Sequence, residues 1–141
     1  VWNDEGTLWA FKSDQDNVND YGDLSGTDSV SGTFIQVPRD IAIGGQTGLE
    51  NWSNANNVFQ FIRIEDIAYD RTDPHVVYLA DTGEPRAVPN AATGRLGRGP
   101  SGTMGPYPNG RIFRMELNDD DPTQVDSLSI LINADLGGCF K

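Results

Sequence analysis

The sequence predicts an all-β chain: one complete four-stranded antiparallel blade of a β-propeller, plus part of the preceding blade. Two observations lead to this fold class. Short apolar runs follow one another in the second half of the chain with turn-forming residues between them, which is the strand order of a single blade. A pattern of Gly, polar, aliphatic, aromatic, variable and large apolar residues also occurs twice, at 6–11 and at 110–115. Such internal repeats are typical of stacked β-units.

The complete blade is expected in the second half of the chain. Its strands are short and rich in β-branched and aromatic residues, which suit a pleated surface. Asp70–Pro74 supplies a turn, and the Gly- and Pro-rich residues Glu84–Asn109 form a long insertion with almost no periodicity. We expect the strands at Ile64–Tyr69, His75–Ala80, Gly110–Leu117 and Leu128–Asn133.

The first half predicts two more strands, Gly6–Lys12 and Gly32–Pro38, joined by an acidic loop at Ser13–Asp28. We expect them to pair in a separate, incomplete sheet. Residues 41–57 fit a helical turn or two as well as they fit irregular structure. In the helical alternative, Thr47 caps the helix and Glu50 follows three residues later.

The chain therefore divides into residues 1–57, a partial blade and inter-blade insertion, and residues 58–141, one blade with an insertion at 84–109. Both parts are expected to belong to one larger propeller domain. A propeller has about four to eight blades, and a single blade cannot bury both of its apolar faces. We expect the faces that carry Trp9, Phe11, Ile112 and Phe113 to stay partly uncovered, with the remaining blades or other chains as partners.

Composition excludes several classes of protein. Ten Lys and Arg stand against 21 Asp and Glu, a formal net charge of −11, so the chain lacks the positive patch that nucleic-acid binding requires. The acidity fits solubility as well as metal binding. No apolar run approaches the roughly 20 residues of a membrane span. The single cysteine, Cys139, excludes an internal disulfide and a cysteine-based zinc cluster.

Glu65 and Asp66 are the candidate metal ligands, because they are acids in an otherwise apolar strand. Neighbouring strand residues point to opposite faces, so the two cannot serve one ion without a bulge. A buried carboxylate needs a partner, which favours a metal or Arg63. The alternative is a strand-end carboxylate that caps a turn or pairs with arginine.

Other chemical side chains have plainer interpretations. Asp81-Thr82-Gly83 matches the aspartic-protease signature, but it has no second copy, so we interpret it as a turn. His75 is expected on the surface. Two acidic groups are interpreted as solvated loops; they are Asp14, Asp16 and Asp20, and Asp119, Asp120 and Asp121.

The Gly-rich segment Gly94–Gly110 and the residue after it carry three arginines, Arg95, Arg98 and Arg111. The segment lacks the Gly-Lys-Ser/Thr ending of a phosphate-binding loop. Two alternatives are open. It is a channel-rim loop whose arginines contact an anionic substrate, or it is an ordered insertion in the blade.

Three segments resemble the bacterial PhoX-type alkaline phosphatase family; they are Phe61–Asp70, Asp73–Gly83 and Gly110–Leu117. The resemblance covers about residues 59–134. It implies a secreted or periplasmic β-propeller that hydrolyses phosphomonoesters, with calcium ions and an iron in its central channel.

By this resemblance, Glu65 matches the family's acidic residue that binds calcium, and Asp66 stands where relatives have Gly or Asp. Cys139 does not match the family's iron-binding cysteine, so no iron ligand is placed, and no catalytic residue is assigned. The expected function is part of a metal-dependent phosphomonoesterase-like propeller, and this chain alone is expected to be inactive. The alternative is a non-catalytic extracellular propeller that works as a binding or assembly module.

Overall fold

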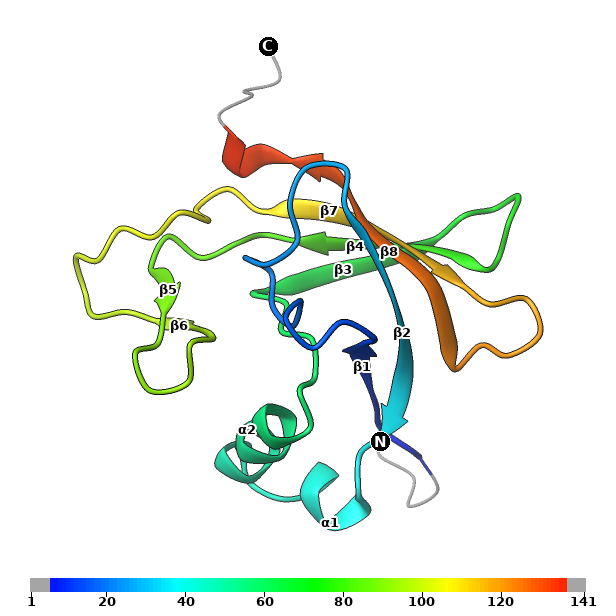
Figure 1. Cartoon of the computed structure of the whole chain (residues 1–141), viewed down its shortest axis with the longest axis horizontal. Helices are drawn as coiled ribbons and strands as arrows, with labels where there is room; N and C mark the ends of the chain where they lie inside the picture. The colour runs from blue at the N-terminus through cyan, green and yellow to red at the C-terminus, as the bar shows by residue number, and fades with distance from the viewer. Residues whose placement is uncertain (1–5, 137–141) are drawn as a thin grey trace.

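The computed structural model describes residues 6–136, and within them β-strands dominate (Figure 1). The helical elements are α1 (Arg39–Ala42), α2 (Gln46–Ala55) and a 3₁₀ turn, η1 (Ala134–Leu136). The strands are β1 (Trp9–Ser13), β2 (Ser29–Gln36), β3 (Ile64–Tyr69), β4 (Val76–Asp81), β5 (Ala87–Pro89), β6 (Leu96–Arg98), β7 (Arg111–Leu117) and β8 (Gln124–Asn133). The chain is all-β in class, as the sequence predicts.

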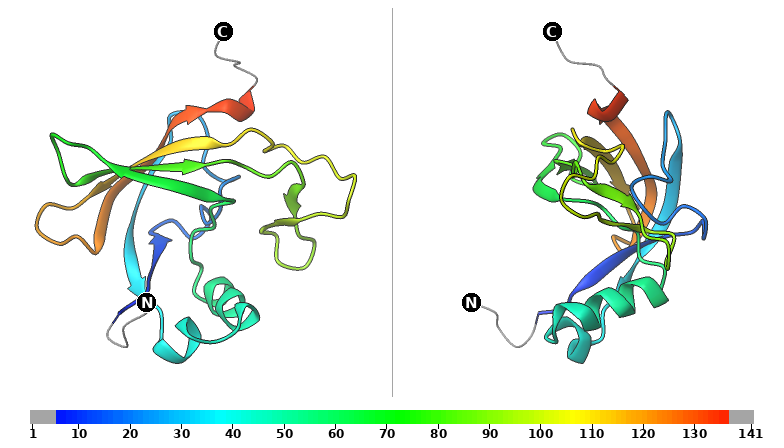
Figure 2. Two further views of the ribbon diagram at one scale, coloured as in Figure 1. Left: turned by 180° about the vertical axis from the view of Figure 1, so that it is seen from behind. Right: turned by 90° about the vertical axis from the view of Figure 1, so that its left-hand side faces the viewer.

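The main sheet has six strands in the order β1-β2-β8-β7-β4-β3, and its neighbouring strands are antiparallel. Within it, β3, β4, β7 and β8 form the predicted four-stranded antiparallel unit in the predicted order. The sheet is strongly twisted and curls around the core (Figures 1 and 2). The insertion after β4 contains a small hairpin, β5–β6.

The prediction that the two N-terminal strands form a separate sheet is wrong. They do pair with each other, with Phe11 opposite Phe34. However, β2 also pairs with β8, with Val30 opposite Leu128. The reason is that β8 begins at Gln124, earlier than predicted, and its added residues offer backbone groups to β2, as at Thr33 opposite Gln124.

Both copies of the sequence repeat fall on strands of this one sheet. β1, at the edge of the sheet, and β7, inside it, flank the β2–β8 pair. Phe11 and Met115 hold the same position in the repeated pattern and are both buried, at 5% and 4% exposure. At the preceding aromatic position the copies differ, because Trp9 is 45% exposed and Phe113 is fully buried.

The expected exposure of apolar faces is therefore only partly met. Trp9 is exposed as predicted, and Ile112 is half-buried. Phe11 and Phe113 are buried by the chain itself, so the prediction for them is wrong. Their cover comes from Tyr21 in the acidic loop and from Phe59, which leads into β3; Tyr21 contacts Phe113, and Phe59 contacts Phe11.

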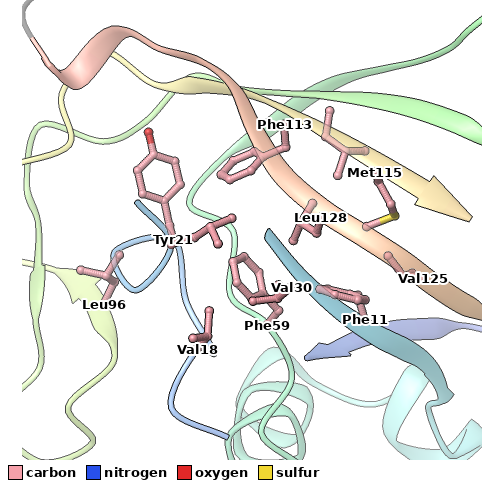
Figure 3. Close-up of a cluster of buried hydrophobic side chains, with 12 residues drawn as sticks. Phe11, Val18, Tyr21, Val30, Phe59, Leu96, Phe113, Met115, Val125 and Leu128 are labelled. Carbon is pink, nitrogen blue, oxygen red and sulfur yellow. The ribbon is translucent and has the colours of Figure 1, made fainter. Parts of the chain in front are cut away.

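The core lies on the inner face of the curled sheet (Figure 3). Its aromatic rings contact one another in a continuous series from Phe34 to Tyr107, with centroid distances of 4.9–5.9 Å. The loop predicted as solvated also contributes core residues, namely Val18, Tyr21 and Leu24. The acidic loop thus covers part of the core as well as connecting β1 to β2.

The helical alternative for residues 41–57 is confirmed, but its predicted cap is wrong. α2 begins after Gly45, whose extended backbone precedes the first turn, and no side chain caps the helix. Thr47 lies inside the helix. None of the helices in residues 6–136 is long and apolar enough to cross a membrane.

The apolar face of the sheet is left open at the β3 end. Ile67 lies opposite Leu79 and Tyr69 opposite Val77, so both belong to the core-facing side of the sheet. Even so, Ile67 is 62% exposed and Tyr69 is 70% exposed. With half-buried Val77 and Leu117 they form what we call the open apolar face.

Candidate functional site

The predicted metal ligands, Glu65 and Asp66, lie on β3, the free edge of the sheet, and both are exposed. A bulge interrupts the β3–β4 register between Ile64 and Asp66. Asp66 lies opposite Ala80, and Glu65 reaches the hydroxyl of Thr82 at 3.5 Å. Since Ala80 and Thr82 alternate with Asp81, the bulge brings both acids to the outer face of the sheet.

Each of these acids has a partner within the chain. Glu65 Oε1 accepts a hydrogen bond from Arg63 Nη2 at 3.0 Å. Asp66 Oδ1 accepts one from the backbone N–H of Ile67 at 2.8 Å. The expectation that a carboxylate is buried in this strand is wrong, because β3 is an edge strand with one face in solvent. Arg63 is the partner that the sequence suggested as the alternative to a metal.

Within residues 6–136 no three His, Cys, Asp or Glu side chains gather in a way that could hold a metal ion. Glu65 and Asp66 therefore supply at most part of the six to eight oxygen ligands that calcium takes. Cys139 lies outside the described residues.

Asp81 ends β4 as predicted, and it has a structural role. Its buried carboxylate accepts hydrogen bonds from the backbone N–H groups of Ile62, Arg63 and Gly83, at 2.8, 3.1 and 2.8 Å. Gly83 has a φ of 66°, a left-handed conformation that favours glycine. The carboxylate thus anchors the segment that enters β3 against the end of β4.

Arg95 and Arg111, two of the three candidate rim arginines, point into the protein. Arg95 is 8% exposed and donates to the carbonyls of Val58, Asn19 and Ser53 and to Asn54 Oδ1. Burial lowers its pKa. This guanidinium fastens β6 to the end of α2 and to the acidic loop, so it is not on a substrate-facing rim.

Arg111 is 6% exposed and donates to the carbonyls of Tyr21 and Leu24, at 2.6 and 2.9 Å. Its guanidinium lies 4.0 Å from the centre of the Tyr21 ring. Asp135 accepts a hydrogen bond from the Tyr21 hydroxyl at 2.6 Å, and burial followed by this bond raises the pKa of Tyr21. The cluster holds the acidic loop against β7.

Arg98, the third of these arginines, is exposed at a groove that we call the hairpin groove. It lies between the β5–β6 hairpin and residues 60–63, has a volume of about 470 Å³, and is lined by Gln60, Ile62, Arg63, Glu84, Leu96 and Arg98 among others. Gln60 Nε2 donates to the carbonyl of Leu96 at 2.7 Å and ties the two walls together. The insertion is thus ordered, and Arg98 is the one of the three candidate arginines that is exposed at this groove, beside Arg63.

Glu84 is the acid of the hairpin groove, and two arginines contact it. Its side chain is 13% exposed and forms ion pairs with both: Oε2 lies 3.1 Å from Arg98 Nε, and Oε1 lies 3.6 Å from Arg86 Nε. The hydrogen bond from the backbone N–H of Arg86 lowers the pKa of Glu84, and the charges of Arg98, Arg86 and Arg63 lower it further. The carboxylate is thus held ionised among three arginines.

The groove continues toward α2 as a second hollow of about 620 Å³. Gln60, Leu96 and Arg98 border both parts. The second part adds neutral polar, apolar and charged side chains, which include Ser53, Asn54, Asn90 and Thr93, Leu49 and Val58, and Glu50 and Arg95. The combined surface joins two exposed arginines, Arg63 and Arg98, to an extension of mixed character that also carries the acid Glu50.

The other acidic candidates are structural or solvated. Asp20 is buried and accepts from the backbone N–H groups of Gly22 and Leu96 at 2.7 and 3.2 Å, which excludes a solvated role for it. Asp119, Asp120 and Asp121 are exposed, as predicted. His75 is partly exposed and its Nδ1 lies 3.2 Å from Asp119.

Gln60 and Glu84 line the groove but are not among the residues predicted from the sequence. A signal was present, because Ala87-Val88-Pro89 and Leu96-Gly97-Arg98 flank a turn-forming Asn-Ala-Ala-Thr-Gly segment, as in a hairpin. Glu84 and Arg86 then precede one strand, and Arg98 ends the other, so opposite charges meet at the base.

Comparison with known proteins finds no family model that matches the chain, no curated protein and no solved structure. The resemblance to the PhoX-type phosphatases is thus neither supported nor opposed by a relative, and it stays a hypothesis.

Proposed function

We propose that the chain is a packing unit of a larger, extracellular or periplasmic β-propeller-like protein and works as a non-catalytic binding or assembly module. The observation that carries this proposal is the open apolar face. Ile67 and Tyr69 are 62% and 70% exposed on the core-facing side of the sheet. Contiguous exposed apolar surface on a soluble protein is typical of an interaction site.

The edge of β3 favours a partner that stacks on this face over one that extends the sheet. Asp70 N–H donates to Val76 O, so by strand alternation the N–H of Ile67 points away from β4. Asp66 already accepts that N–H. An occupied edge amide and a bulge both discourage strand addition. Stacking of sheet on sheet, as between propeller blades, remains open to the apolar face.

A paired lysine scan tests the assembly proposal. Ile67→Lys with Tyr69→Lys should abolish concentration-dependent self-association and dye binding by the chain, as followed by sedimentation velocity and ANS fluorescence. The control pair, Ile43→Lys with Met104→Lys, changes side chains that are 74% and 80% exposed but lie off this face. A wild-type chain that unfolds cooperatively as a monomer and binds no ANS would contradict the proposal.

The second candidate is a calcium-dependent phosphomonoesterase-like propeller, with calcium in a central channel. The observation that favours it is the bulge in β3, which lets Glu65 and Asp66 share the outer face at a free edge strand. These two residues would supply part of a calcium shell, and other blades would supply the rest. Calcium there would clamp the phosphate and stabilise its developing charge.

Calcium titration calorimetry on the assembled protein tests this candidate. Glu65→Gln keeps the size of the side chain and removes its charge, so calcium affinity should fall by about tenfold or more. Asp120→Asn, in an exposed loop, should leave the affinity unchanged. Equal affinities for wild type and Glu65→Gln would remove Glu65 from the site.

A further inference from the structure

We propose that the hairpin groove binds the carboxylate of a small ligand between Arg63 and Arg98. The groove is lined by residues that precede β3 and by the β5–β6 hairpin, and it shares no residue with the open apolar face, so it does not depend on the assembly proposal. Both side chains are more than half exposed, at 53% and 67%, and both line the same groove of about 470 Å³.

Both arginines have hydrogen-bond donors to spare. Arg63 reaches Glu65 through Nη2, and Arg98 reaches Glu84 through Nε. A guanidinium carries five N–H donors in a planar fork, so each side chain keeps several for a ligand. A planar carboxylate matches that fork and forms paired, charge-assisted hydrogen bonds with it.

Three arginines gather at or beside the groove in this acidic chain. The chain has a formal net charge of −11, yet the charges of Arg63, Arg86 and Arg98 all act on Glu84, while Glu65 pairs with Arg63. Arg95 also borders the adjoining hollow, where it is buried. The arginines attract an approaching anion, while Glu50 in the adjoining hollow opposes one.

The balance of charges favours a carboxylate over a phosphate. Glu84 pairs with Arg98 and Arg86, and Glu65 pairs with Arg63, so the surplus of positive charge is small. A singly charged anion fits that surplus, whereas a dianion would meet repulsion from both glutamates.

The rest of the surface suits the body of such a ligand. Ile62 and Leu96 offer apolar contact, and Gln60 offers an amide. The hollow toward α2 adds Asn54, Asn90 and Thr93. An acylated amino acid or the end of a peptide has this combination of one carboxylate, an amide and an apolar side chain.

NMR titration of the 141-residue chain with N-acetyl-L-leucine tests the proposal. We expect shifts centred on Gln60, Arg63, Leu96 and Arg98. Arg98→Gln and Arg63→Gln should each weaken binding by about tenfold, the effect of losing a charge-assisted pair. Glu65→Gln frees Arg63 and should strengthen binding, whereas the calcium site proposed for Glu65 would be weakened by the same variant.

Three controls make the experiment decisive. Arg71→Gln removes an exposed arginine in the turn after β3 and should leave affinity unchanged. N-acetyl-L-leucine amide lacks the charge and should bind at least about tenfold more weakly. Inorganic phosphate should also bind more weakly than the carboxylate. Equal affinity for the amide, tighter binding of phosphate, or equal losses in Arg71→Gln and Arg98→Gln would overturn the proposal.

Discussion

The two ends of the main sheet differ in how far the rest of the chain covers them. At the β1 end, Phe59 crosses the edge strand: its N–H donates to the carbonyl of Phe11 at 2.8 Å, and the two rings lie 5.8 Å apart. Both side chains are buried, at 3% and 5% exposure. At the β3 end, no comparable cover lies over Ile67 and Tyr69 among residues 6–136.

The comparison teaches that edge and face are protected separately. At the β1 end one residue, Phe59, both donates to the backbone of the edge strand and covers its apolar face. At the β3 end a bulge and Asp66 occupy the edge, while the face stays bare. Because sheet edges are managed against unwanted pairing, a blocked edge beside an open face points to stacking as the expected contact.

The largest expected difference between the two ends is in core packing. Phe59→Ala should cost about 3–5 kcal/mol of unfolding free energy, because it empties a buried aromatic site. Tyr69→Ala should change the free energy by less than about 0.5 kcal/mol, because its side chain is mostly in solvent. Urea unfolding followed by tryptophan fluorescence measures both. Similar losses in the two variants would show that the β3 face is covered in solution.

The junction between the closed and open parts is the next test. Asp81→Asn replaces one acceptor oxygen with an amide donor that faces the N–H of Ile62 or Arg63. The variant should lose about 2 kcal/mol, the cost of a buried donor left without its partner. The matched control, Asp120→Asn, lies in an exposed loop and should be neutral. A neutral result for Asp81→Asn would mean that the entry to β3 is held by other contacts.

Local sequence signals were enough for most of the strands. The four-stranded unit is found in the predicted order, because each strand has its own β-branched and aromatic run bounded by turn residues. The connection between β2 and β8 could not be predicted. It joins residues about 90 positions apart, such as Thr33 and Gln124, and part of it lies at the start of β8, where Val125 is the one apolar residue among Gln124, Asp126 and Ser127.

The candidate site was less predictable, because long-range burial decides which charged groups reach solvent. Arg95, Arg98 and Arg111 look alike in a Gly-rich sequence. In the fold, Arg95 and Arg111 are buried by the acidic loop, which supplies Asn19, Tyr21 and Leu24 as acceptors. Only Arg98 remains at the surface. Nothing in the local pattern around the three arginines indicates which of them a distant loop will cover.

A smaller effect is expected at the β3 edge itself. Asp66→Ala frees the N–H of Ile67 for pairing with another chain, while the exposed position should keep the unfolding free energy within about 0.5 kcal/mol. We therefore expect faster aggregation at unchanged stability, followed by light scattering and thioflavin fluorescence. Asp120→Ala removes the same charge elsewhere and separates the edge effect from lost repulsion. Equal aggregation rates for the two variants would assign the effect to charge alone.

The smallest expected effect is a local response to acid that differs between the two ends. At the open end, the hydroxyl and the backbone N–H of Thr72 donate to Asp70 and, with the hydroxyl of Tyr78, hold its pKa at about 2. At the closed end, burial and the charge of Asp23 raise the pKa of Asp20.

The signs are opposite. A depressed folded-state pKa gives stability that is present above the ordinary value of 3.8 and is lost as pH falls toward 2. A raised pKa means that the folded state binds its proton more tightly, so acid favours the fold at Asp20. Amide exchange of Thr72 should therefore accelerate between pH 4 and 2, beyond the intrinsic change, while that of Phe59, which donates to the carbonyl of Phe11 at the closed end, should not. Thr72→Val removes the hydroxyl donor and should shift the acceleration to higher pH. Identical pH profiles at the two amides would mean that acid opens the sheet as a whole, and the distinction between its ends would fail.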